Sequence, residues 1–526
     1  MKNIEIPLQA EKTKKYIFFE KLPALLSWSL IFLPLVLSQI SPPLTALFIL
    51  SYLLMWFARA VGMNIRVLHA WKVLNEHQRQ NWSILLSDLE KRDISPDQPK
   101  WHSRNIQRLE KYPAKFKPSE VLHGIIIAVY NESIEIIEPT IKAVIDSNFD
   151  KKKIVLTVAY EERGGKEVEE TVKKLVSKYK SHFLMADAYM HPMDLPDEVI
   201  GKGGNINFAG RKLQAWFETQ NIDPARVLIT TLDADNRPHP NYFASLTYTF
   251  CLCPEPKYIS FQPTPVFSNN IWDVPAPMRV IATGNSFWMV VLSMRTHMLR
   301  NFSSHAQPLD ALIETDFWSS RTIVEDGHQY WRSYFRFNGK YEVYPVYSSI
   351  YQDAVLSDTY RKTLRAQFIQ LRRWAWGASD IAYVFQKGFL TKNKVPKLDL
   401  ATKLFRLIEG HVSWATAPII VTFAAFIPIL FNPEDIAANQ LPNIASYIQR
   451  IATLGLIITM YLSFKSLPPK PARYKKHRNI FLVLQWALLP ITGIFYNAMS
   501  AQVSQNRLLF GRYLDKFDVT QKSIKK

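Results

Sequence analysis

The sequence predicts an α/β domain with a mainly parallel β-sheet, flanked by transmembrane and interfacial helices. Three observations support this fold class. Short apolar runs of strand character alternate with helical patterns in the middle of the chain. Long uncharged runs lie near both ends. A polar stretch of more than 300 residues, from about Asn64 to Arg406, separates the two sets of apolar runs.

The composition fits a membrane-associated protein with a large polar part. Hydrophobic residues make up 48% of the chain, and the formal net charge is +19. Nucleic acid, anionic lipid and a phosphorylated substrate each attract such a charge. A nucleic-acid partner is disfavoured, because the sequence has no metal-finger spacing and no basic zipper. Cys251 and Cys253 lack the further Cys or His partners of a zinc site, so we expect reduced thiols in a cytosolic domain.

The sequence predicts a cytoplasmic N-terminal segment at residues 1–21 and a transmembrane hairpin at residues 22–62. The run from Leu22 to Ile40 carries no charge, prolines interrupt the chain, and a second run continues to about Gly62. Each run is close to the ~20 residues that cross a bilayer as a helix. A cleavable signal peptide is the alternative for the first run, which is long for such a segment. Basic residues at both ends of the hairpin place those ends in the cytoplasm.

Residues 407–500 predict C-terminal membrane helices, with apolar runs at about Leu407–Phe431, Ile444–Phe464 and Asn479–Ser500. Three full spans would leave the basic tail, residues 501–526, outside, against the positive-inside rule. The third run is the least apolar and is broken by Pro490. We therefore predict that this run is re-entrant, interfacial or split into two short helices, which returns the tail to the cytoplasm.

The polar stretch divides into a connecting region, 63–120, a candidate catalytic domain, 121–345, and interfacial helices, 346–406. Strands are predicted at His123–Tyr130, Ile154–Tyr160 and Arg226–Leu232, with a helix at Ile134–Ser147. Parallel sheets bind ligands beyond the carboxyl ends of their strands. The acidic residues that follow these strands are Glu161, Glu162, Asp233 and Asp235.

Asp233 and Asp235 are candidate metal ligands. Two carboxylates spaced i, i+2 at a strand end can hold Mg²⁺ or Mn²⁺, which prefer oxygen ligands and bind with substrate phosphates. A solvated turn is the alternative, since Asp-x-Asp alone is common on surfaces. The position directly after a buried-looking strand favours the metal site.

Five motifs occur in a specific order: Ile127-Ala-Val-Tyr-Asn-Glu132, Gly201-Lys-Gly-Gly-Asn-Ile-Asn207, Asp233-Ala-Asp235, Val324-Glu-Asp326 and Gln370-Leu-Arg-Arg-Trp374. This order resembles the family-2 glycosyltransferases, and the flanking apolar runs resemble their cellulose synthase-like membrane branch. The tail segment Phe517-Asp-Val-Thr-Gln-Lys522 is similar to the gating segment of that branch. Val324 stands where the family usually has Thr.

The resemblance implies a metal-dependent, inverting enzyme with a glycosyltransferase A-type fold. The implied donor is a nucleotide sugar, by family a uridine-diphosphate sugar. The implied location is the plasma (inner) membrane, with the catalytic domain in the cytoplasm. The resemblance also implies a role for each motif residue: Asp326 as the base, with Glu325 beside it; Asp233, Lys202, Gln370 and Arg373 at the donor diphosphate; Glu161 and Glu162 near the nucleotide base; Trp374 at the acceptor; and Phe517, Val519, Thr520 and Lys522 in gating.

Simpler explanations exist for each motif. Acidic residues are favoured at helix N-termini, which would account for Glu325 and Asp326. An ordinary Gly-rich loop would account for Lys202, and a helix core for Trp374. The acceptor is either a growing polysaccharide or, in a single transfer, a lipid carrier. A transporter or a non-catalytic sensor is disfavoured, because the carboxylates lie in a polar domain and Asp235 and Asp326 are both present.

Overall fold

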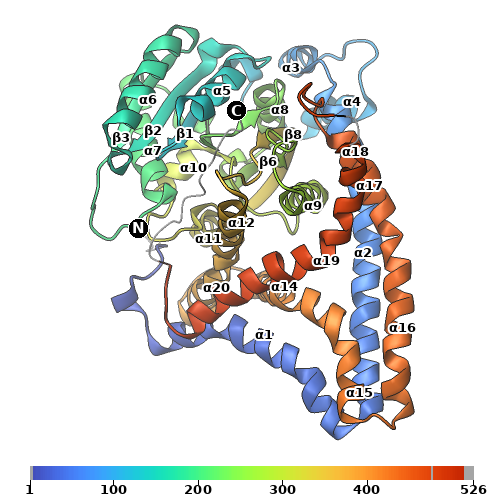
Figure 1. The fold of residues 1–526 in the computed structure, drawn as a ribbon. Coiled ribbons are helices and arrows are strands. Elements are labelled where there is room, and N and C mark those ends of the chain that lie inside the picture. The colour runs from blue at the N-terminus through green and yellow to red at the C-terminus, as the bar shows by residue number, and fades with distance from the viewer. Residues whose placement is uncertain (1–3, 476–477, 515–526) are drawn as a thin grey trace.

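A computed structural model describes residues 4–475 and 478–514. An α/β unit lies on one side of the molecule, and long helices extend away from it on the other (Figure 1). The expected gating residues Phe517, Val519, Thr520 and Lys522 lie outside the described residues.

The α/β unit is built on one mixed, mostly parallel sheet with the strand order β3-β2-β1-β4-β7-β6-β8-β5. β1 pairs in parallel with β2 and β4, and β6 with β8, whereas β7 and β5 pair antiparallel with their neighbours. The prediction of a mainly parallel sheet is confirmed. The strands are β1 Leu122–Val129, β2 Ile154–Glu161, β3 Met185–His191, β4 Val227–Asp233, β5 Arg237–Pro238, β6 Ile259–Phe267, β7 Ala306–Pro308 and β8 Glu342–Gln352.

Helices cover both faces of the sheet, which explains why β1, β2 and β4 are almost continuously buried and largely apolar. Ile125 and Ile127 of β1 enter the core shared with α5, α6 and α8, whereas Ile126 enters the core shared with α7 and α10. These helices are α5 Ile134–Ile145, α6 Gly165–Tyr179, α7 Lys202–Thr219, α8 Tyr242–Cys251 and α10 Leu309–Glu314.

Further helices connect this unit to the long apolar helices. They are α3 Trp82–Lys91, α4 Lys100–Lys111, α9 Ala276–Ser293, α11 Glu325–Arg336, α12 Tyr360–Ala375 and α13 Asp380–Phe385, with the π-helical turn η9 Gln386–Leu390.

Within residues 4–475 and 478–514, five helical segments are long and apolar enough to cross a membrane, in agreement with the integral membrane protein that the apolar runs predict. The first begins earlier than expected, at Lys14 rather than Leu22. The segments are Lys14–Ile40 (α1), Pro42–Gln78 (α2), Lys397–Phe431 (α14 Lys397–Phe423 and α15 Ile427–Phe431), Ile436–Ser466 (α16 Ile436–Thr453 and α17 Gly455–Ser466) and Asn479–Leu509 (within α18 Arg478–Leu484, α19 Leu489–Thr492 and α20 Met499–Leu509).

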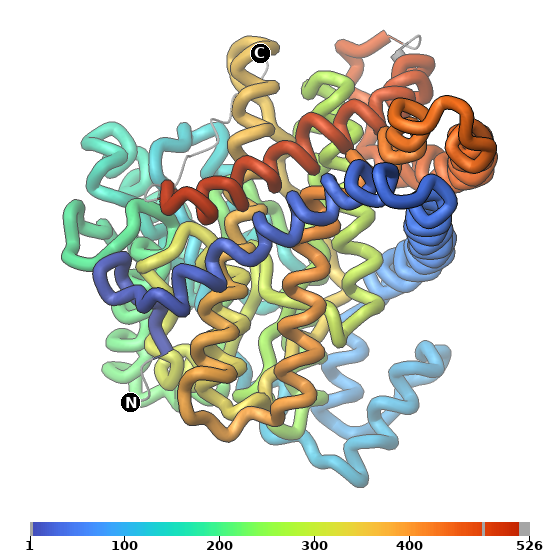
Figure 2. The backbone as a smooth tube through the Cα atoms, turned by 90° about the horizontal axis from the view of Figure 1, so that it is seen from below, coloured from blue at the N-terminus to red at the C-terminus, as the bar shows by residue number. Residues whose placement is uncertain are grey.

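The fifth segment changes helix type twice, at a 3₁₀ turn over Gln485–Leu488 and a π turn over Gly493–Ala498. Its last part, α20, lies beside α1 (Figure 2), where Ser27 Oγ donates a hydrogen bond to Gln505 at 2.7 Å. The segment is thus composed of short helical pieces. Whether it re-enters the membrane stays a prediction.

The chain before α1 packs into the α/β unit. Ile4 and Ile6 are buried, and the hydroxyl of Tyr383 donates to the carbonyl of Ile4 at 2.6 Å. Glu5 pairs at 3.0 Å with Arg332 of α11, whose side chain is 1% exposed. Burial raises the pKa of Glu5, but the charges of Arg332 and His328 and the hydrogen bonds from Ser319 and Ile6 together outweigh it and lower this pKa below its ordinary value. Glu5 therefore neutralises a buried cation of α11.

We expect Glu5→Gln to lower the free energy of unfolding by about 2 kcal/mol, since it removes the charge from a hydrogen bond to a buried ion. Because the pKa of Glu5 is lower in the folded chain, this contribution is present at neutral pH and is lost as the pH falls through the folded pKa. Thermal unfolding of the full chain at pH 7 and at about pH 4 measures both effects. Glu170→Gln, at an exposed position of α6, is the control. Equal stabilities of Glu5→Gln and the unmodified chain at pH 7 would contradict the pairing.

Candidate active site

Asp233 is the last residue of β4, at the edge of the sheet where the carboxyl ends of the parallel strands meet. The rest of the strand is buried, but the side chain of Asp233 is 34% exposed. Its Oδ2 accepts a hydrogen bond from Ser303 Oγ at 2.7 Å. β4 therefore ends in a carboxylate that Ser303 holds at one oxygen and that is still partly exposed.

Lys202, the first residue of α7, joins three of the predicted site residues. Its Nζ lies 2.9 Å from Asp233 Oδ1, 3.6 Å from Asp326 Oδ2 and 3.8 Å from Glu325 Oε1. Burial by itself lowers the pKa of Lys202, but the carboxylates outweigh it, so the pKa is raised. The structure thus brings the Gly-Lys-Gly-Gly, Asp-Ala-Asp and Val-Glu-Asp motifs together around one permanent cation.

Gly203 makes this convergence possible. A Cβ at this position would lie 2.4 Å from the carbonyl oxygen of Ser319 and 3.3 Å from Glu325 Cβ. Two residues on, the Asn205 amide donates to the carbonyls of Val129 and Ala159, which ties α7 to the ends of β1 and β2. The start of α7 therefore fits tightly between the sheet edge and the start of α11.

Glu325 and Asp326 begin α11 and differ in their surroundings. The side chain of Glu325 is 3% exposed, and that of Asp326 is 20% exposed. Burial, followed by the nearby charge of Asp326, raises the pKa of Glu325. Asp326 is the more exposed of the pair and therefore the carboxylate that a substrate can reach.

His305 also faces Asp326, although no sequence pattern singled it out, since a single histidine has no spacing to recognise. Its Nδ1 lies 3.6 Å from Asp326 Oδ1 and 2.9 Å from the carbonyl of Phe302. Trp318 Nε1 donates to His305 Nε2 at 3.1 Å, which leaves the proton of a neutral ring on Nδ1. Burial lowers the pKa of His305. His305 therefore lines the site as a neutral side chain, and Lys202 is the cation that compensates the charge of the carboxylates.

Asp235 is more enclosed than Asp233. It is 4% exposed, and its Oδ2 accepts a hydrogen bond from the backbone N–H of Asp353 at 3.0 Å. When the side-chain amide of Asn236 is oriented so that its oxygen accepts from the Asp233 backbone, its nitrogen donates to Asp235 Oδ1 at 3.2 Å. Across the described ranges, no three His, Cys, Asp or Glu side chains form a ready metal cage. The carboxylates still fit a hard cation that takes one or two protein oxygens and completes its shell with phosphate and water.

Gln370, Arg373 and Trp374 lie in half-buried positions of α12. Trp376 and Ala378, which directly follow this helix, pack against Ile323 and Val324, the residues that lead into α11. The Trp374 ring lies 6.0 Å from the ring of Phe267, the last residue of β6. The end of α12 therefore lies beside the start of α11, at the edge of the sheet that carries Asp233.

Glu161 and Glu162 lie at the carboxyl end of β2, two strands from β4 and so roughly 10 Å away. Glu161 is buried and forms an ion pair with Arg163, whose guanidinium lies 5.5 Å from the centre of the Tyr130 ring. Glu162 accepts a hydrogen bond from the backbone of Met193 at 2.9 Å. These contacts place the two glutamates at the rim of the site, apart from the Lys202 cluster.

Comparison with known proteins places the chain in a family context. The model of the family described as glycosyl transferase family group 2 matches residues 228–499. No curated protein matches the sequence. The mannosyltransferase PcManGT of Pyrobaculum calidifontis, solved with GDP-Man and Mn²⁺, is similar over 85% of this chain and 99% of its own, at 12% identity and a TM-score of 0.44. S. aureus TarS 1–349, solved with UDP-GlcNAc, is similar over 75% of this chain and 93% of its own, at 11% identity and a TM-score of 0.37.

We expect Gly203→Ala to displace the start of α7 and lower the turnover of any reaction at this site by about 10²-fold, because ångström shifts of positioned groups have such effects. Gly327→Ala is the matched control: it lies next to Asp326, but its Cβ meets nothing within 4 Å. The measurement is the initial rate of both variants in the assay described below, with thermal unfolding alongside. Equal rates in the two variants would show that the close approach at Gly203 is unimportant.

Proposed function

Because this chain belongs to glycosyl transferase family group 2, whose model matches just over half of its length, we propose that it transfers a sugar from a nucleotide-activated donor to an acceptor hydroxyl in one inverting displacement. The observation that carries this proposal is the cluster of Lys202 with Asp233, Glu325 and Asp326 at the carboxyl edge of the sheet. It combines a cation for a leaving diphosphate with a carboxylate for an attacking hydroxyl.

Asp326 is the proposed base. The acceptor oxygen attacks the anomeric carbon, the bond from that carbon to the diphosphate oxygen breaks, and the electron pair leaves with the diphosphate. The hydroxyl proton goes to a carboxylate oxygen of Asp326, which is the more accessible of the two carboxylates. A single displacement inverts the anomeric centre, so an α-linked donor gives a β-linked product.

The donor diphosphate is proposed to lie beside Lys202, Gln370 and Arg373. Lys202 keeps its proton over the working pH range and is already held in place, so it needs little reorganisation when negative charge develops. Asp233, with Asp235, would hold Mg²⁺ or Mn²⁺, which when bound neutralises charge on the diphosphate. Glu161 and Glu162 at the rim would contact the nucleotide base, for which we propose uracil.

The acceptor is proposed to approach along the side of Trp374, whose flat face suits the apolar face of a sugar. A growing polysaccharide is the favoured acceptor and a lipid carrier the alternative; the five apolar helices would serve either. We propose that the α/β unit lies on the cytoplasmic side of the plasma (inner) membrane, where nucleotide sugars occur and where basic loops are retained.

The decisive experiment incubates the purified full-length chain with a panel of nucleotide sugars and measures the released nucleoside diphosphate, then the size of the product. Release with one donor, together with a glycosylated product, supports the proposal. The absence of any release across the panel, from protein that is folded by thermal unfolding, would overturn it.

Asp326→Asn should reduce turnover by about 10²–10⁴-fold, the usual effect of losing a positioned base, while donor affinity changes little. Asp316→Asn, a change at an exposed carboxylate ahead of the same helix, is the control. The measurements are nucleoside diphosphate release and calorimetric donor binding. Near-normal turnover in Asp326→Asn would exclude it as the base.

A chelator should abolish activity, and Mg²⁺ or Mn²⁺ should restore it. Asp233→Asn and Asp235→Ala should bind the donor weakly even with excess cation, because a hard cation loses an oxygen ligand. Full activity in the chelator would remove the metal from the mechanism without removing the transfer itself.

Trp374→Ala should shorten or eliminate polymer, because the acceptor sugar loses its stacking surface, whereas Trp374→Phe should retain part of the product length. Product sizing by gel filtration distinguishes the two variants. A product that carries one sugar on a lipid in the unmodified enzyme would favour the lipid-carrier alternative.

A further inference from the structure

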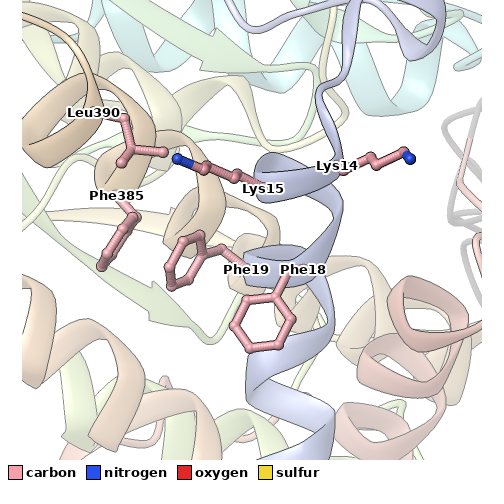
Figure 3. Close-up of a pocket in the computed structure, with 6 residues that line it drawn as sticks. All are labelled: Lys14, Lys15, Phe18, Phe19, Phe385 and Leu390. Carbon is pink, nitrogen blue, oxygen red and sulfur yellow. The ribbon is translucent and has the colours of Figure 1, made fainter.

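An apolar groove lies where α1 begins. It has a volume of about 420 Å³ and is lined by Lys14, Lys15, Phe18, Phe19, Phe385 and Leu390. In Figure 3, Phe18 and Phe19 come from α1, while Phe385 and Leu390 approach from the end of α13 and from η9. The groove is thus formed between the first long apolar helix and the part of the chain that follows α13.

The wall of the groove is almost entirely hydrocarbon. The rings of Phe19 and Phe385 stack with their centroids 3.5 Å apart, and Phe18 and Leu390 are 54% and 45% exposed. Apart from the two lysines, no lining side chain can donate or accept a hydrogen bond. A sugar would leave its hydroxyls unpaired against such a wall, whereas a hydrocarbon chain requires no partner.

The lysines add a cationic rim. Figure 3 shows the Lys15 side chain extending toward Leu390, across the groove, and the Lys14 side chain extending the opposite way. More lysines follow on the η9 side, at 387, 392, 394 and 397, and no acidic side chain lines the groove. Lys14 and Lys15 belong to the first turn of α1, a helix able to cross a membrane. A basic side chain at the end of such a helix is attracted to anionic lipid headgroups.

We propose that this groove binds one anionic phospholipid, with an acyl chain against Phe19 and Phe385 and the phosphate at Lys15. The cationic rim fits the phosphate of such a lipid, and the hydrocarbon wall fits its acyl chain. The groove also lies at the end of a candidate membrane helix. A free phosphate would use only the rim, and a neutral lipid only the wall.

Bound lipid would also hold together the elements that support α11. Phe385 ends α13, whose Tyr383 donates to the carbonyl of Ile4. The adjoining Glu5 pairs with Arg332 of α11, the helix that starts with Glu325 and Asp326. The groove therefore lies on the same junction that fixes the start of the chain to the active-site helix.

The test measures retention of phosphatidylglycerol and phosphatidylcholine by the full-length chain in detergent, counted by native mass spectrometry. We expect preferential retention of phosphatidylglycerol. Lys15→Gln should weaken retention about fivefold, the usual effect of one basic residue at an anionic surface, and Lys15→Arg should preserve it. Lys14→Gln is the matched control, since it removes the same charge from the same turn, while the Lys14 side chain extends in the opposite direction from that of Lys15.

Phe19→Ala should weaken retention through loss of the wall, and thermal unfolding verifies that each variant is folded. Equal retention of both lipids, or equal losses in Lys14→Gln and Lys15→Gln, would overturn the proposal in favour of general surface attraction. Displacement of the lipid by inorganic phosphate or glycerol phosphate at low millimolar concentration would also overturn it, since the rim alone would then be the site. None of these outcomes depends on sugar transfer.

Discussion

The ammonium group of Lys202 is the centre around which the active-site edge is organised. Three carboxylates from two other segments lie within 3.8 Å of it, in a place from which water is largely excluded. Without a cation there, buried Glu325 and its neighbours would repel one another at the meeting point of α7, β4 and α11. A donor diphosphate brings still more negative charge to this point. The same lysine can therefore stabilise the protein before the substrate binds and the leaving group afterwards, with little movement.

The geometry of the sheet explains why these residues meet. Because β1, β2, β4 and β6 run in one direction, each strand delivers its following loop to the same edge. The short antiparallel strand β7 lies between β4 and β6, and residues 303–305 just before it bring Ser303 and His305 to the same edge. The residues that directly follow α12 complete the edge through their contact with the segment before α11. The site is therefore composed of loops and helix ends that the sheet aligns.

The sequence predicted the strands β1, β2 and β4 well, because buried parallel strands are recognisable as β-branched apolar runs that end in polar turns. It also singled out Lys202, Asp233 and Asp326, because their motifs occur in a recognisable order. Their common contact was beyond prediction, since it depends on the close approach at Gly203. The contribution of His305 and the enclosure of Asp235 by the backbone of Asp353 arise from tertiary packing alone, for which periodicity carries no signal.

The pairing of Glu5 with Arg332 has a consequence for biosynthesis. More than 300 residues separate the two partners, so at ribosomal rates roughly 20 to 60 seconds pass between their syntheses. During this interval α1 and α2, which come directly after Glu5, are already available to the membrane insertion machinery. The contact between the segment before α1 and α11 therefore forms late, after both of these apolar helices have been synthesised.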